Sequence, residues 1–177
     1  MKKSVLIWEL VGVIIIILSG SMLHFVFDWS GQWKPIALIA AVNESVWEHL
    51  KLGFWPALLY AVIEYRYLKK STHNFLLAKT TALYLIPISI VILFYSYTAI
   101  LGYNVLVIDI LIFAIAVAIG QLASYKLLTS RQFSRPLNRF ALIALAVIVL
   151  MFLLFTFFPP HLPIFRDPIT GGYGIIK

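Results

Sequence analysis

The sequence of 177 residues contains no cysteine, which excludes disulfide bonds, thiolate metal ligands and cysteine nucleophiles. Charged residues are also scarce, at 12% of the chain, where soluble domains have about 25%. Hydrophobic residues instead make up 62%, against about 45–50% in soluble domains. So few charges on so apolar a chain predict a polytopic membrane protein, whose first partner is the lipid bilayer.

The long apolar stretches indicate how often the chain crosses the membrane, since about 20 helical residues span the hydrocarbon core. We predict an all-α, polytopic membrane helix bundle that forms a single domain over residues 1–177. Residues 35–50 hold too short an apolar run to span, and we expect a re-entrant or interfacial amphipathic helix there. Residues 159–177 are expected to fold back as a C-terminal lid. The five expected spans are residues 4–27, 52–68, 75–101, 105–128 and 140–158.

The net charge of +7 comes from basic residues that flank the apolar stretches and do not form one patch. We therefore expect no nucleic-acid partner. Ten of the 14 lysines and arginines fall in segments on the same side as the N-terminus. Because basic residues collect on the cytoplasmic side, this pattern predicts a cell (plasma) membrane protein with its N-terminus in the cytoplasm and its C-terminus outside.

Two acidic residues fall toward the cytoplasmic side in this orientation. We expect Glu9 to pair with another helix or to extend its charged head group toward the membrane surface. Glu64 is expected to reach Arg66, Lys69 or Lys70 near the inner surface.

The most polar stretch in the chain is Asn43-Glu44-Ser45-Val46-Trp47-Glu48-His49-Leu50-Lys51. A charge at bilayer depth costs about 2.5–3.5 kcal/mol, so these groups should be paired, hydrated or bound to a metal. In a continuous helix, Glu44 and Glu48 lie on one face because they are four residues apart. Ser45 and His49 share that face by the same spacing.

Imidazoles and carboxylates from four segments fall on the outer side in the expected orientation. Such ligand sets suit Zn²⁺, Mn²⁺ or Fe²⁺, although no H-E-x-x-H motif is present. The alternative is a buried network of hydrogen-bonded ion pairs that holds the helices together. The candidate metal ligands, with Zn²⁺ as the favoured ion, are His24, Glu44, His49, His161 and Asp167.

A bound metal ion would lower the pKa of a water molecule and so generate a nucleophile. The first functional hypothesis is therefore a metal-dependent membrane hydrolase that acts on a lipid-like or amphipathic substrate. Glu48 or Glu44 would be the general base, and Ser45 would stabilise an oxyanion or orient the ligand. Two alternatives remain open: a small-solute binding or transport module, and a structural subunit of a larger membrane complex.

Three segments carry a resemblance to a known family: His24-Phe25, residues 43–51 and the tail His161-Leu162-Pro163-Ile164-Phe165-Arg166-Asp167-Pro168. They resemble a family of small prokaryotic multipass membrane proteins of unknown function. The resemblance implies a multipass membrane fold and brings no known activity.

A second resemblance rests on the spacing of Ser45 and His49 alone. A serine followed four residues later by a histidine is similar to the motif of the alkaline ceramidase and adiponectin-receptor superfamily, whose members are membrane metallohydrolases. The chain departs from that superfamily because it has no H-x-x-x-H pair and because five spans are expected in place of seven. The similarity implies a metal-dependent hydrolase.

Overall fold

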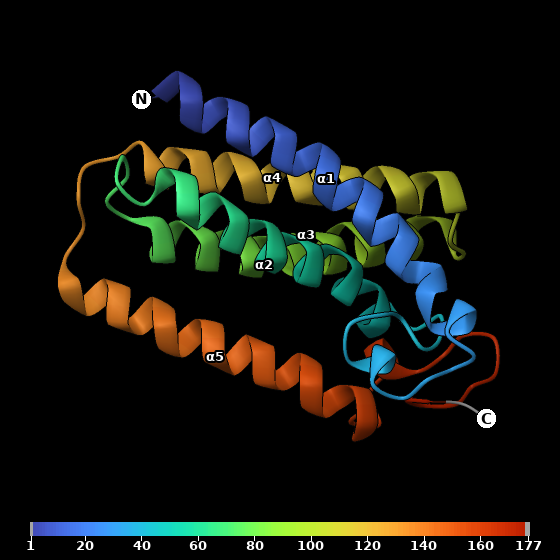
Figure 1. Ribbon diagram of the computed structural model, residues 1–177. Helices are drawn as coiled ribbons and strands as arrows, with labels where there is room; N and C mark the ends of the chain where they lie inside the picture. Colours follow the sequence, from blue (N-terminus) through green and yellow to red (C-terminus); the bar gives the residue numbers. More distant parts are fainter. Residues whose placement is uncertain (1, 176–177) are drawn as a thin grey trace.

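The computed structural model describes residues 2–175, which form five long helices and two short 3-10 helices. Consecutive long helices run in opposite directions, so the two termini lie at opposite ends of the bundle (Figure 1). We call the end that holds the last described residues the C-terminal end. The helices are α1 (Lys2–Trp29), η1 (Ile36–Leu38), α2 (Val46–Leu68), α3 (Phe75–Leu101), α4 (Leu106–Leu128), α5 (Arg135–Phe157) and η2 (Pro163–Phe165).

Four of the helices, α1, α3, α4 and α5, are long and apolar enough to cross a membrane. Large apolar side chains on their outward faces are exposed, among them Ile14, Leu18 and Ile92. Such a surface suits lipid, because a soluble protein rarely exposes contiguous apolar patches of this extent. The protein is therefore a multipass membrane protein in a lipid bilayer, as its composition predicts.

The prediction of five apolar spans is wrong, because the segment expected at residues 52–68 belongs to α2, which is not apolar enough to be a candidate span. Within α2 lie the charged residues Glu48, Lys51 and Glu64, and all three are buried. Helices α1 and α3 pack against α2, so its charged side chains find partners inside the protein. A helix with one face packed inside the protein can carry charged residues on that face, while its outward face, with Leu59 and Val62, stays apolar and exposed.

The predicted helix over residues 35–50 is also wrong. The range holds two separate pieces, η1 and the start of α2 at Val46, with a non-helical loop between them. The Ser45 amide donates to Asn43 Oδ1 at 2.8 Å, and Ser45 Oγ accepts from the Glu48 amide at 3.4 Å. These bonds between side chains and nearby backbone groups compete with a continuing helix and cap the start of the next one. Glu44 thus lies outside α2 and does not share a helical face with Glu48.

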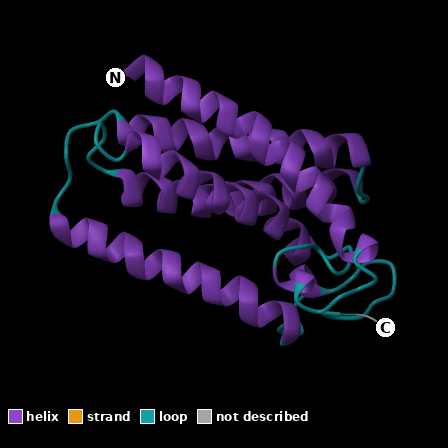
Figure 2. Ribbon diagram, in the orientation of Figure 1, coloured by secondary structure: helices purple, strands orange, loops and turns teal. Residues whose placement is uncertain are grey.

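The chain after α5 folds back on the segment that precedes α2, and these two segments lie together at the C-terminal end (Figure 2). Asn43 Nδ2 donates to the Gly174 carbonyl oxygen at 2.7 Å. The Phe165 ring is buried, with its centroid 4.7 Å from that of Trp47. The polar stretch and the tail, both singled out in the sequence, therefore dock on each other. That the tail acts as a lid over a ligand stays a prediction.

The contact between α1 and α2 at Gly20 leaves no room for a side chain. A Cβ atom there would lie 2.4 Å from the Leu52 carbonyl oxygen and 2.8 Å from the Phe113 ring. Since backbone cannot move aside cheaply, we expect Gly20→Ala to lower the free energy of unfolding by about 1–3 kcal/mol. Denaturation followed by circular dichroism in detergent measures this change. The neighbouring Ser21 is exposed, so a Ser21→Ala variant with an equal loss would contradict the close packing.

Candidate functional site

Three of the five candidate metal ligands meet at the C-terminal end. His24, Glu44 and His49 each offer one ligand atom, and these atoms all lie within 4.8 Å of one another. His49 Nε2 is 3.4 Å from Glu44 Oε2, and His24 Nε2 is 3.9 Å from Glu44 Oε1. Their side chains are 30% (His24), 45% (Glu44) and 34% (His49) exposed. The group is therefore open to solvent or to a ligand on one side.

The three side chains come from separate segments of the chain. His24 belongs to the last two turns of α1, and His49 belongs to the first turn of α2. Glu44 lies in the loop between η1 and α2, where its backbone amide donates to Asp167 Oδ1 at 3.3 Å. Together with the bond from Asn43 to the tail, this bond to the tail residue Asp167 helps to hold Glu44 beside the two histidines.

The orientation of the His49 ring is set by its own helix. His49 Nδ1 lies 2.9 Å from the Ser45 carbonyl oxygen, which can only accept a hydrogen bond. Nδ1 therefore donates to this carbonyl oxygen, and Nε2 is the ring nitrogen that faces Glu44. Metal-binding histidines are usually held in this way, with the other ring nitrogen donating to a carbonyl or carboxylate.

The spacing of the three ligand atoms can be compared with that of a zinc site. Zn²⁺ binds imidazole nitrogen at about 2.0–2.1 Å, so two ligand atoms of a tetrahedral site lie about 3.4 Å apart. The His49–Glu44 distance of 3.4 Å meets this value, and the His24–Glu44 distance of 3.9 Å exceeds it. A small closing movement of exposed side chains would bring all three within reach of one ion. Three protein ligands with an open fourth position are typical of catalytic zinc sites.

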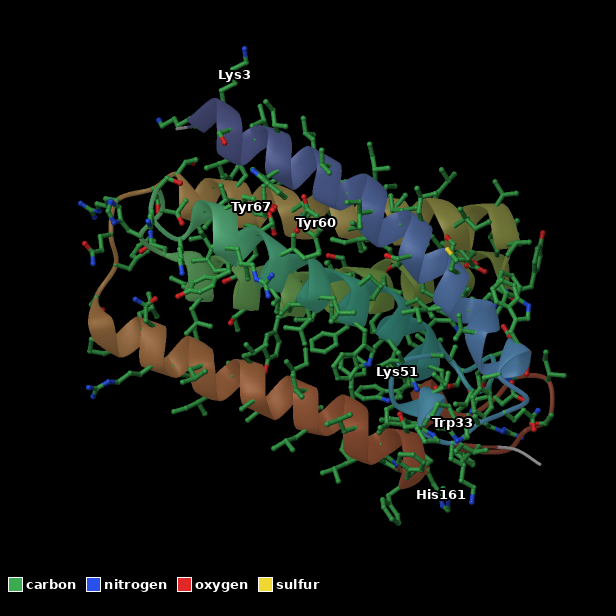
Figure 3. All side chains as sticks on the ribbon, in the orientation of Figure 1. Lys3, Trp33, Lys51, Tyr60, Tyr67 and His161 are labelled. Atoms are coloured by element: carbon green, nitrogen blue, oxygen red, sulfur yellow. The ribbon has the colours of Figure 1, made fainter. Side chains whose placement is uncertain are left out.

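The other two candidate ligands lie apart from this group. Figure 3 shows His161 at the edge of the C-terminal end, and its ring centroid is 4.6 Å from that of Tyr173. Asp167 is buried in the tail, where Oδ1 accepts from Glu44 N, and Oδ2 accepts from both the amide and the hydroxyl of Thr170. Neither residue belongs to the group of converging ligand atoms in the described part of the chain.

The hydrogen bonds to Asp167 also decide its charge. Burial raises the pKa of the Asp167 carboxyl, but the bonds from Thr170, Ile169 and Glu44 outweigh burial and hold the pKa below its ordinary value. Asp167 is therefore ionised at neutral pH, and it acts on the candidate site by fixing the Glu44 backbone.

Glu48, the expected general base, is held in a buried ion pair. Its carboxylate Oε2 lies 2.5 Å from Lys51 Nζ and accepts from the Val42 amide at 3.0 Å. Lys51 also donates to the Ala37 carbonyl oxygen at 2.8 Å and to Thr156 Oγ1 at 3.1 Å. These bonds tie α2 to η1 and α5, which gives the Glu48–Lys51 pair a structural role. The catalytic role of Glu48 stays a prediction.

Ser45, the second expected catalytic residue, is 1% exposed and caps α2 through its hydroxyl oxygen. It contacts His49 through its carbonyl oxygen and not through its hydroxyl. The four-residue spacing of serine and histidine therefore has a local explanation in helix capping. An oxyanion-stabilising role for Ser45 also stays a prediction.

A second charged cluster lies in the interior of the bundle. Lys79 Nζ in α3 is 2.7 Å from Glu9 Oε1 in α1 and 2.5 Å from Glu64 Oε2 in α2. Glu9 thus pairs with another helix, which confirms one of the two alternatives predicted for it. The predicted pairing of Glu64 with basic residues near the inner surface is wrong. The sequence does carry a signal for this cluster, because a lysine within a membrane span requires a carboxylate partner.

Comparison with known proteins gives one match, to a family model described as "Family of unknown function (DUF6512)", which covers residues 1–175. No curated protein and no solved structure matches the chain. The match agrees with the resemblance to a family of unknown function noted in the sequence. It assigns no activity, so any function must be argued from the residues themselves.

Proposed function

The chain belongs to DUF6512, a family of unknown function, and from its own residues we propose that it binds a divalent metal ion, preferably Zn²⁺, through His24, Glu44 and His49. The observation that carries the proposal is the convergence of three ligand atoms from three separate segments within 4.8 Å. The bond from His49 Nδ1 to the Ser45 carbonyl oxygen supports it further, because it leaves Nε2 free for the ion.

The proposed activity is metal-dependent hydrolysis of an amphipathic, lipid-like substrate. Zn²⁺ with three protein ligands and an open position lowers the pKa of bound water to about 7, which supplies a nucleophile at neutral pH. The partial exposure of the site leaves room for substrate, and the candidate spans beside it provide an apolar environment for a lipid tail. Because Glu48 is held by Lys51, the metal ion would activate the water without it.

The orientation of the site follows from the distribution of basic residues and is part of the proposal. With the N-terminus in the cytoplasm, the C-terminal end of the bundle faces the outside of the cell membrane. The substrate would then be drawn from the outer leaflet.

Metal binding can be measured directly on the purified protein. We expect the wild type in detergent, incubated with zinc sulfate and freed of unbound metal, to retain stoichiometric Zn²⁺ by elemental analysis. His49→Ala should weaken Zn²⁺ affinity by at least about 100-fold, since loss of a ligand exceeds the 10- to 100-fold cost of losing an outer hydrogen bond. His161→Ala should bind as the wild type does, because the His161 ring packs against Tyr173 and lies outside the group of converging ligand atoms.

The matched control is His73→Ala, which removes an exposed histidine from the turn between α2 and α3 at the opposite end. A wild type that binds no Zn²⁺, or equal losses in His49→Ala and His73→Ala, would contradict the proposal. If His49→Ala only lowers the melting temperature, the group is a structural network of hydrogen bonds. Release of a fluorescent fatty acid from amphipathic ester and amide substrates, with and without added Zn²⁺, then tests hydrolysis separately.

A further inference from the structure

The Glu9–Lys79–Glu64 cluster is a buried site with two carboxylates and one ammonium group. The side chains of Glu9, Lys79 and Glu64 are 3%, 6% and 1% exposed. Both carboxylates contact the same Nζ atom, so they lie close to each other as well as to the lysine. Among the described residues, Lys79 is the single cation in salt-bridge contact with either carboxylate.

Four helices contribute polar groups to this cluster. Besides the two carboxylates and Lys79, helix α4 provides Ser124, whose hydroxyl donates to Glu9 Oε1 at 2.7 Å, and Gln121, whose amide lies 3.4 Å from the Glu9 carbonyl oxygen. Helix α2 also provides Tyr60, labelled in Figure 3, whose hydroxyl donates to the Trp8 carbonyl oxygen at 2.7 Å. None of these neutral groups supplies the missing positive charge.

Three oxygen atoms of the cluster are buried without a hydrogen-bond partner in the part of the chain that the structure describes. They are Glu9 Oε2, Glu64 Oε1 and Glu64 Oε2, the last of which lies in ion-pair contact with Lys79 Nζ. A buried oxygen that carries negative charge and accepts no hydrogen bond is costly in a low-dielectric interior. When two carboxylates face each other in such surroundings, both cannot ionise at low cost, and one takes up a proton.

We propose that Glu9 and Glu64 share one exchangeable proton beside Lys79, so that the cluster is a proton-binding site inside the helix bundle. The proton comes from water and neutralises the excess negative charge, which leaves one carboxylate paired with the ammonium group. The hydroxyl of the protonated acid becomes a donor that can reach the facing carboxylate. This site is separate from the candidate metal site and does not depend on it.

The cluster also has a route by which a proton can exchange. Lys79 lines a groove of about 350 Å³ between α2, α3 and α5. Its walls are mostly apolar, with Leu58 and Leu145 among them, and Tyr65 and Thr80 add hydroxyl groups. Lys79 is among the residues that line the groove, so we take the groove as the route by which the proton exchanges with the outside of the bundle. Intramembrane ionisable groups with such access are typical of ion and proton pathways, which favours the transport alternative for this part of the molecule.

Infrared spectroscopy tests the proposal, because a protonated carboxylic acid has a C=O stretching band that a carboxylate lacks. We expect the wild type at neutral pH, in a detergent free of carbonyl groups, to show this band and to shift it in D₂O. Glu9→Gln and Glu64→Gln should each lose the band, since the remaining carboxylate then pairs one to one with Lys79. Glu44→Gln, which changes an exposed carboxylate, and His49→Ala should both keep it.

Absence of the band in the wild type, or its survival in either glutamine variant of the cluster, would overturn the proposal. If a glutamine variant does not fold, the pH dependence of the wild type's folding equilibrium still tests the proposal. The folded state keeps a proton on the cluster that the unfolded chain releases at lower pH. As pH rises, the folding equilibrium constant should therefore fall, by up to tenfold per pH unit, until the folded protein releases that proton as well. A wild type that lacks the infrared band and also lacks this pH dependence of folding has no such site.

Discussion

Lys51→Met should lower the free energy of unfolding by about 3–5 kcal/mol. The Lys51 side chain is fully buried and its ammonium group binds Glu48, the Ala37 carbonyl oxygen and Thr156 Oγ1. Methionine fills nearly the same volume but leaves the Glu48 carboxylate buried without its cation. Because these bonds join α2 to η1 and α5, we also expect the C-terminal end to lose its order. The midpoint of chemical denaturation in detergent, followed by circular dichroism, measures the loss.

Two further variants test whether the lost charge pair causes the effect. Lys34→Met removes an exposed lysine from the loop after α1 and should change the free energy of unfolding by about 0.5 kcal/mol or less. Glu48→Gln combined with Lys51→Met should recover much of the stability, since no buried charge is then left alone. If the double variant is as unstable as Lys51→Met, the loss comes from packing and not from the unpaired carboxylate.

Lys79→Met should destabilise the protein at least as strongly, by about 3–5 kcal/mol or more at neutral pH. Its ammonium group is the cation that Glu9 and Glu64 share in the interior of the bundle. Without it, the carboxylate that stays ionised beside the shared proton is buried without its cation. Lower pH should reduce the loss, because protonation removes the charge that methionine cannot balance. Thermal unfolding of the wild type and the variant over a range of pH measures both effects.

The control for Lys79→Met is Lys70→Met, which changes an exposed lysine just after α2 and should have little effect. Adding Glu9→Gln and Glu64→Gln to Lys79→Met should restore stability, since the cluster is then neutral. A Lys79→Met protein that unfolds like the wild type at neutral pH would show that the ion pairs do not stabilise the bundle.

The extent of the apolar helices could be predicted from the sequence because their boundaries are local. The expected span at residues 75–101 coincides with α3, which follows the polar turn Ser71–Asn74 and ends before Gly102. Gly102 has a φ of 79°, a left-handed conformation that favours glycine and ends a helix. Long apolar runs bounded by such signals leave few alternatives for α1, α4 and α5 as well.

The polar stretch shows where the helical pattern misled the prediction. The spacing of Glu44 and Glu48 suggested one continuous helix, but Asn43 and Ser45 bond to nearby backbone amides and interrupt it. The serine followed three residues later by a glutamate was itself a sign of a helix start. His24, Glu44 and His49 nevertheless meet, because the loop returns to the end of α1 and not because of helical spacing.

The sequence by itself determined that the protein is an all-α, multipass membrane protein, because its apolar composition and the length of its apolar runs reflect the bilayer and not the contacts between helices. Only the tertiary structure decided which charges meet. Glu9 and Lys79 are 70 positions apart, and no local pattern links them. The partner of Glu64 likewise could not be recognised from α2 itself, because Lys79 belongs to α3. The Glu48–Lys51 pair is local, at a spacing of three residues, but only the packing of η1 and α5 against α2 buries it and supplies its further hydrogen bonds.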